Sequence, residues 1–202
     1  MAKGKSFERD TSRELSSWLT NGKDDDAVWY TKSSGGRATR RKKLYNESRK
    51  YDHGDLGPDD STTEYFFDRF SIELKTGYAS KRKKSYQLWS ILDALDSNQS
   101  TPWFYQFWTE AKIDADASKR EPMLIFRRLR RLPCIAMHED IFNQFKKCAL
   151  DAPIDHITVN INNEHPVTVA NMRHFFYWTK GMMNQIFISF RINRAIMHRR
   201  HG

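Results

Sequence analysis

The sequence predicts an α/β protein in which a short mixed β-sheet is flanked by helices. Apolar and polar residues alternate from Phe70 to Lys75, which is the two-residue period of a half-buried strand. Helical patterns precede and follow this strand, and further short apolar strands come later in the chain. This order fits helices on both sides of a single sheet.

The first half of the chain is expected to contain one helix and three strand segments. Residues 6–19 have helical spacing, and a short strand follows at 27–31. Residues 52–56 are interpreted as the edge of a strand and 59–63 as a hairpin tip, where Pro-Asp is favourable turn chemistry. The main strand is placed at 66–75.

The second half is expected to add helices and strands in alternation. Helices are predicted at 86–95 and at 139–149. A further helix is expected to follow a cap at Ser100 or Thr101, with Pro102 in its first turn. Strands are predicted at 123–126 and 134–137, and a hairpin at 156–161 and 166–169. We assign residues 1–150 to a core and 151–202 to an accessory C-terminal region.

Charge points to a polyanionic partner. The 202-residue chain has a formal net charge of +9 and suits one domain with a real core. Basic residues cluster at 37–50, 81–84 and 127–131. One such cluster would suit a solvated basic surface, but three around a candidate acidic site favour nucleic acid.

Cysteine usage and hydropathy predict an intracellular, cytoplasmic protein. Cys134 and Cys148 are the two cysteines and form no Cys-x-x-Cys pattern, which argues against a disulfide framework or a four-cysteine zinc site. No apolar signal region opens the sequence, and no uncharged stretch reaches membrane-spanning length.

Asp55, Glu73 and Lys75 are the residues with the clearest chemical potential. The strand alternation places Glu73 and Lys75 on one face, and Asp55 precedes that strand. Mg²⁺ takes oxygen ligands and needs few carboxylates from the protein, whereas a lysine can stabilise charge that develops on a phosphate. The alternative to a catalytic role for Glu73 and Lys75 is a solvent-facing ion pair. Glu8 is a further candidate, although its spacing alone favours a first-turn charge that complements the helix dipole.

Four short motifs together resemble the PD-(D/E)xK nuclease superfamily. They are Ser6-Phe7-Glu8, the turn Ser33-Ser34-Gly35-Gly36, Gly54-Asp55-Leu56 and Ile72-Glu73-Leu74-Lys75. Within the superfamily, the chain looks most like archaeal-type Holliday-junction resolvases and the resolvase-like nucleases of phages and prophages. The resemblance covers about the first two-thirds of the chain and is specific mainly through motif order and spacing.

The resemblance implies roles for these residues. Asp55, Glu73 and Glu8 would be metal ligands and site carboxylates, Lys75 the catalytic lysine, and Ser34 (or Ser33) a group near the scissile phosphate. Gly54 stands where many members have proline, and a literal Pro-Asp occurs at Asp59. We choose Asp55 over Asp59 because Asp59 lies in the expected turn.

The expected function is a Mg²⁺-dependent DNA endonuclease, with Mn²⁺ able to substitute, that acts on branched DNA such as four-way junctions in recombination. A homodimer is implied by the resemblance, because two strands must be cut symmetrically. The alternative is a DNA-binding or packaging accessory protein that keeps the fold without cutting. The expected DNA-binding residues are Arg37, Arg40, Arg41, Lys42, Lys43, Lys81, Arg82, Lys83, Lys84, Arg127 and Arg128.

Overall fold

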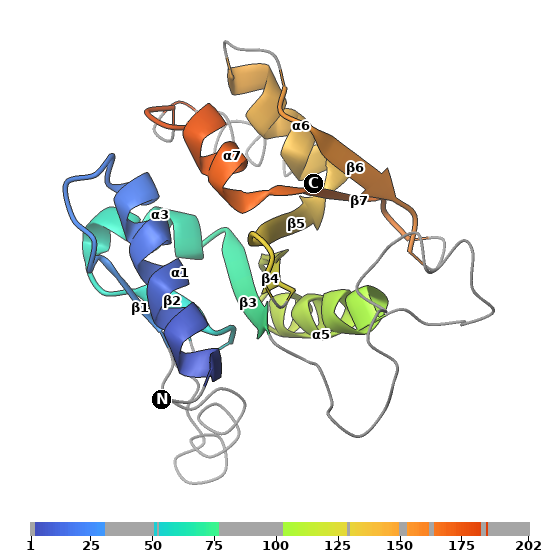
Figure 1. The fold of residues 1–202 in the computed structure, drawn as a ribbon, viewed down its shortest axis with the longest axis horizontal. Helices are drawn as coiled ribbons and strands as arrows, with labels where there is room; N and C mark the ends of the chain where they lie inside the picture. Colours follow the sequence, from blue (N-terminus) through green and yellow to red (C-terminus); the bar gives the residue numbers. More distant parts are fainter. Residues whose placement is uncertain are drawn as a thin grey trace, which may run out of the picture.

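The computed structural model describes residues 3–30, 51, 53–76, 103–128, 130–149, 153–161, 164–182 and 185. The expected turn at 33–36, the basic segments 37–50 and 81–84 and the helix expected at 86–95 lie outside these residues. The elements can be followed from blue to red in Figure 1.

A mixed sheet forms the centre of the molecule, as the sequence predicts. Its strand order is β3 (Phe70–Thr76), β4 (Glu121–Arg127), β5 (Cys134–His138), β7 (Val167–Asn171) and β6 (His156–Val159). The β3–β4 pair is parallel, and the other neighbouring pairs are antiparallel. A separate two-stranded antiparallel sheet joins β1 (Val28–Tyr30) to β2 (Leu56–Pro58).

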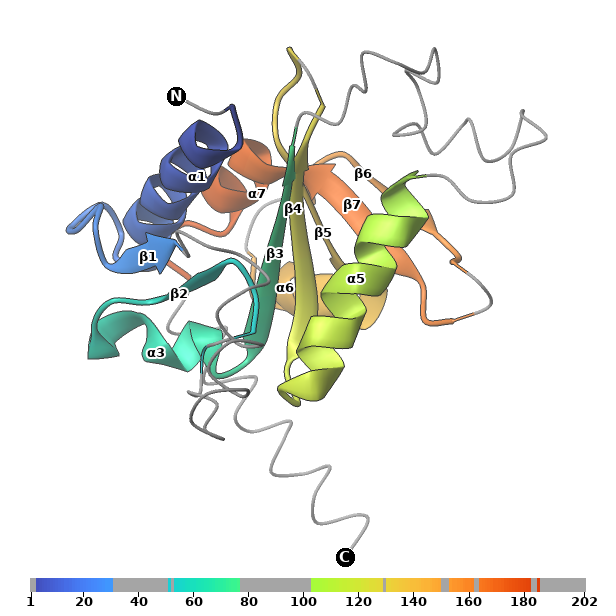
Figure 2. The same cartoon turned by 90° about the horizontal axis from the view of Figure 1, so that it is seen from below.

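Helices cover both faces of the sheet. Figure 2 shows α5 (Trp103–Ala117) on one side of β3 and β4, and α1 (Lys3–Leu19) on the other. The larger core also takes side chains from α3 (Ser61–Phe67), α6 (Glu139–Cys148) and α7 (Met172–Trp178). Because both faces are buried, β4 is a nearly continuous apolar run rather than an alternating one.

The alternation of β3 separates two environments. Phe70, Ile72 and Leu74 belong to the larger core, on the side of α1. The intervening residues lie on the opposite face, and there Ser71 is buried whereas Glu73 and Lys75 are only partly covered. This face receives Phe107 and Glu110 of α5 at its carboxyl end. The predicted strand face is therefore confirmed, but it lies beneath a helix.

The hairpin tip expected at 59–63 is wrong, and so is the early start of the main strand. Asp60 is the N-cap of α3, with its carboxylate accepting a hydrogen bond from Thr62 N at 2.8 Å. Phe66 and Phe67 lie within this helix and are completely buried. Aromatic residues suit both a strand and the buried side of a helix. Their type therefore does not distinguish the two, and the predicted start of the strand was four residues too early.

The C-terminal hairpin belongs to the main sheet. The strand β7 pairs with β5 along five residue pairs, and β6 pairs with β7 at the edge. Both strands fall within the stretch that the sequence analysis assigned to an accessory region. Among the described residues, no helix combines the length and the apolar character needed to span a membrane.

Candidate active site

Asp55 is fixed against the backbone of β3. Its N–H donates to the carbonyl of Ile72 at 2.7 Å, and its Oδ2 accepts from the N–H of Leu74 at 2.8 Å. Leu74 stands between Glu73 and Lys75, so the hydrogen bond places the Asp55 carboxylate beside both side chains. The residue is 7% exposed.

Gly54 explains why proline is absent before Asp55. Its φ is +93°, a conformation that proline cannot adopt and that other residues adopt rarely. A Cβ at this position would lie 2.8 Å from the carbonyl oxygen of Ile72. Glycine therefore lets the chain approach β3 closely enough for the two Asp55 hydrogen bonds to form.

Lys75 is held by two carboxylates. Its Nζ lies 2.6 Å from Oε1 of Glu73 and 2.7 Å from Oε2 of Glu110 on α5. The same ammonium lies 5.4 Å from the centroid of the Phe107 ring. Glu73 and Lys75 thus form a partly buried pair with Glu110 as a third charged partner, rather than a solvent-facing ion pair.

The electrostatics of the site favour a bound cation. Burial raises the pKa of Asp55 to about 6, against the opposing effects of the Leu74 N–H and Lys75. Burial raises the pKa of Glu73 to about 7, and the neighbouring Asp55 charge adds to this effect. For Lys75, burial works to lower the pKa, but Glu73 and Glu110 outweigh it, so the pKa is raised. Lys75 therefore stays charged beside two carboxylates that hold their protons unusually well.

Glu8 lies near enough to Asp55 for its charge to raise the pKa of that residue. The helix α1 begins at Lys3, and its first turn holds no acidic residue. The interpretation of Glu8 as a first-turn charge is therefore wrong, because the helix starts earlier than the sequence analysis placed it.

Arg127 lies at the carboxyl end of β4, next to the end of β3. Its guanidinium lies 4.6 Å from the centroid of the Phe7 ring on α1. The neighbouring Arg128 is exposed. Among the expected DNA-binding residues, these two are the ones that the structure describes, and Ser34 also falls outside the described part of the chain.

Arg120 fastens the segment that carries Asp55. Its Nη2 donates to the carbonyl of His53 at 2.8 Å, and its Nη1 donates to the carbonyls of Phe67 and Phe70 at 3.2 and 3.3 Å. One guanidinium therefore joins the loop before Asp55 to the end of α3 and the start of β3.

Sequence reasoning missed Glu110, Asp114 and Arg120. Asp114 raises the pKa of both Asp55 and Glu73 through its charge. Glu110 and Asp114 are four residues apart on α5, a spacing that puts two side chains on one helix face. That spacing is the signal that could have identified them.

The donor set fits a hard divalent cation. Among the described residues, no group of three or more His, Cys, Asp or Glu side chains is arranged to hold a metal ion. Mg²⁺ can, however, bind through one or two carboxylates together with water and substrate phosphate oxygens. Asp55, which is buried, and Glu73, which is partly buried, both have raised pKa values, and such an ion would stabilise both carboxylates in the ionised form.

An aspartate anchored to a strand that carries Glu-x-Lys, within a mixed sheet covered by helices, defines the PD-(D/E)xK nuclease class. Residues 1–185 match the family described as "Phage putative PDDEXK endonuclease", and the chain belongs to this family of phage nucleases. The match confirms the resemblance to the PD-(D/E)xK superfamily and to its phage-type members. No curated protein and no solved structure matches the chain.

Proposed function

We propose that this protein is a divalent-metal-dependent DNA endonuclease whose site is formed by Asp55, Glu73 and Lys75. The observation that carries the proposal is the anchoring of Asp55 to Leu74 N, which brings its carboxylate beside Glu73 and Lys75. A nuclease family, a net charge of +9, the buried Asp55 carboxylate and the contact between Glu73 and Lys75 support the same chemistry.

Asp55 and Glu73 would hold Mg²⁺ or Mn²⁺, with Glu8 as a candidate third carboxylate. When bound, the ion supplies Lewis acidity toward the scissile phosphate and lowers the pKa of water. The Leu74 N–H fixes one oxygen of Asp55 and so orients the carboxylate. Lys75 keeps its proton and can donate to a phosphate oxygen as negative charge develops there.

Glu110 has a positioning role in this proposal. It contacts Lys75 from the helix that covers the strand, and its side chain is 55% exposed. The carboxylate therefore holds the ammonium at the open side of the site. A phosphate oxygen approaching from solvent would find Lys75 already directed toward it, which reduces the conformational entropy lost on binding.

The proposed substrate is branched DNA such as a four-way junction, cut by a homodimer. This part rests on the resolvase-like motif order and on the basic segments 37–50 and 81–84. Two symmetric cuts need two sites, and an isologous dimer supplies them.

The test is cleavage of a labelled four-way junction, a linear duplex and a single strand, each with Mg²⁺, Mn²⁺ or EDTA. Glu73→Ala and Asp55→Ala are expected to reduce cleavage by about 100-fold or more. DNA binding in EDTA should be retained or tightened, because carboxylate repulsion is removed. The matched control is Glu64→Ala, an exposed carboxylate on α3, which should cleave like the unaltered protein.

Cleavage that survives both substitutions would reject the site. Tight binding with no cleavage under any metal would instead favour a DNA-binding or packaging accessory protein. Equal rates on the junction and on the duplex would remove the structure selectivity but leave the nuclease proposal intact.

A further inference from the structure

A groove separates α1 from α7, on the far side of the molecule's larger core from α5. Its volume is about 380 Å³. The residues of α7 and the following turn that line it are Arg173, Phe176, Tyr177 and Lys180, which have the spacing of one helical face. The residues of α1 that line it are Arg13, Glu14, Ser17 and Trp18.

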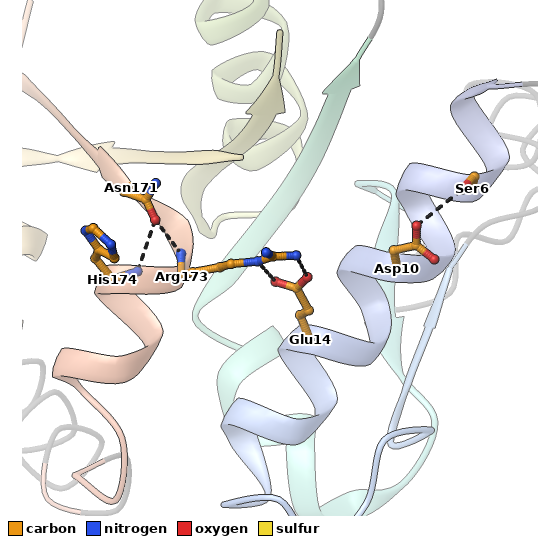
Figure 3. Close-up of polar contacts among 6 residues, drawn as sticks. All are labelled: Ser6, Asp10, Glu14, Asn171, Arg173 and His174. Carbon is orange, nitrogen blue, oxygen red and sulfur yellow. Dashed lines mark hydrogen bonds and ion pairs between the residues drawn. The ribbon is translucent and has the colours of Figure 1, made fainter. Parts of the chain in front are cut away.

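The groove is held open by fixed contacts at both ends and in its floor. Figure 3 shows Arg173 reaching from α7 to Glu14 of α1, where Nη2 lies 2.7 Å from Oε1 and Nε donates to Oε2 at 3.3 Å. At the other end, Gly181 N donates to Oδ1 of Asn21 at 3.0 Å. In the floor, Trp18 Nε1 donates to Oγ1 of Thr179 at 3.0 Å. The two walls therefore keep their spacing without a ligand.

The floor is aromatic and the rim is cationic. Trp18 and Phe176 stack with centroids 4.5 Å apart and are almost completely buried. Tyr177 stands beside this floor with 84% of its surface exposed, the most exposed large hydrophobic residue among those described. Arg173 is paired with Glu14, so the excess positive charge comes from Arg13 and Lys180.

An exposed aromatic ring in a groove that is also lined by two cations has the chemistry of a site for an unpaired nucleotide. Bases stack on aromatic side chains without regard to sequence, and the flanking phosphates pair with lysine and arginine. In a duplex the faces of the bases are occupied by their neighbours, so Tyr177 could not be used in this way.

We propose that the α1–α7 groove binds an unpaired DNA strand, with a base stacked on Tyr177 and phosphates contacting Arg13 and Lys180. This inference rests on the proposed function in one respect, that DNA is the polymer bound. The groove is formed by other residues than the carboxylate site. Strands at the open centre or frayed end of branched DNA are the source of unpaired bases for such a groove.

The test measures binding of the full chain in EDTA to short fluorescein-labelled oligothymidylate and to a duplex, by fluorescence anisotropy. Tyr177→Ala should weaken binding of the single strand by about 5- to 100-fold and change duplex binding by less than about twofold. Tyr177→Phe keeps the stacking ring and should bind within about twofold of the unaltered protein. Ile157→Ala, an exposed apolar residue on β6, is the matched control.

A second measurement addresses the cations. The double substitution Arg13→Gln with Lys180→Gln should reduce the salt slope of single-strand binding by about 1.4. An oligonucleotide with one 5-iododeoxyuridine should photo-cross-link to the peptide containing Tyr177, and Tyr177→Ala should abolish that product. Thermal melting of each variant checks that the fold is intact, as expected for side chains at an exposed rim.

Unchanged single-strand affinity in Tyr177→Ala would overturn the proposal, and so would an equal loss for the duplex. Equal losses in Tyr177→Ala and Tyr177→Phe would overturn the stacking arrangement. Failure here is distinct from failure of the nuclease. A protein that cleaves but ignores Tyr177 rejects the groove, whereas one that binds through Tyr177 but never cleaves rejects the nuclease.

Discussion

Gly54 sets the position of the most deeply buried carboxylate of the candidate site. Its φ of +93° turns the chain toward β3, and the lack of a Cβ leaves room for the carbonyl of Ile72. The residue therefore carries two separate restrictions, one on conformation and one on space.

Gly54→Ala is expected to lower the free energy of unfolding by about 3 kcal/mol, because it adds a close contact to backbone strain. Gly181→Ala is the matched control, since Gly181 has a φ of +79° but open space around it. Gly181→Ala should lower the free energy of unfolding by about 1 kcal/mol, because it adds backbone strain but no close contact. Urea denaturation checks both values, and equal losses would show that the close approach to Ile72 does not matter.

At the scale of residues, the common face of Glu73 and Lys75 was predictable because a strand alternates with a period of two residues. It could not show how Asp55 is held, since the partner is a backbone N–H that no motif marks. Glu110 was missed for a different reason. Several exposed positions on α5 carry carboxylates, and only the packing of the helix on β3 decides which one meets Lys75.

At the scale of elements, Arg120 bonds three carbonyls that precede it by 50 to 67 residues in the sequence. Its donors satisfy the carbonyls of His53, Phe67 and Phe70, so the loop before Asp55 and the start of β3 keep a fixed relation. Arginine suits this role because its planar fork presents several N–H groups at once, which lysine cannot do.

Arg120→Ala is expected to lower the free energy of unfolding by about 2–4 kcal/mol, because it removes the guanidinium donors of three backbone carbonyls. It should also raise the Mg²⁺ concentration needed for half-maximal cleavage, since Asp55 loses its fixed position. Arg120→Lys should rescue neither property, and the exposed neighbour change Lys119→Ala should affect neither. Full rescue by lysine would contradict the positioning role.

The elements that sequence reasoning misplaced share a cause. Residues 66–67 are aromatic and apolar, and a strand and a short buried helix use such residues equally well. The decisive signal was Asp60 as a helix cap, but Pro58-Asp59 offered a competing turn. Long periodic segments such as α1 and α6 had no competitor, and both helices were predicted.

At the scale of the whole molecule, the fold class was predictable because helices alternate with strands along the chain. The strand order was not, because β7 enters the sheet between β5 and β6 through pairings that local pattern does not encode. The sequence therefore predicted a mixed sheet and its two covered faces, but it did not place the C-terminal hairpin in that sheet.

Stability should depend on pH through the two site carboxylates. Their pKa values in the folded protein, about 6 and about 7, exceed the ordinary 3.8 and 4.5. The folded state therefore binds more protons than the unfolded state between these limits, and its stability falls as pH rises through them. Without metal, the free energy of unfolding should fall by on the order of a few kcal/mol between about pH 4.5 and pH 8, and the melting temperature should fall with it.

Calorimetry of the metal-free protein checks this expectation. Asp55→Asn combined with Glu73→Gln should flatten the decline, and Mg²⁺ should reduce it by binding the ionised carboxylates. Glu64→Gln, on the exposed side of α3, should leave the profile unchanged. Two results together would contradict the burial of this pair. The melting temperature of the unaltered protein would rise between pH 4.5 and 8, and the double variant would show the same profile as the unaltered protein.

The reach of Arg120 back to His53, across 67 residues, has a consequence for biosynthesis. A nascent chain that has left the ribosome only as far as β3 already contains Asp55, Glu73 and Lys75, but it still lacks Arg120, which ties the His53 carbonyl to the end of α3 and the start of β3. The proposed active site should stay incomplete until the turn before β4 has emerged. Under the proposed function, a partly synthesised chain that ends before Arg120 should not cut DNA.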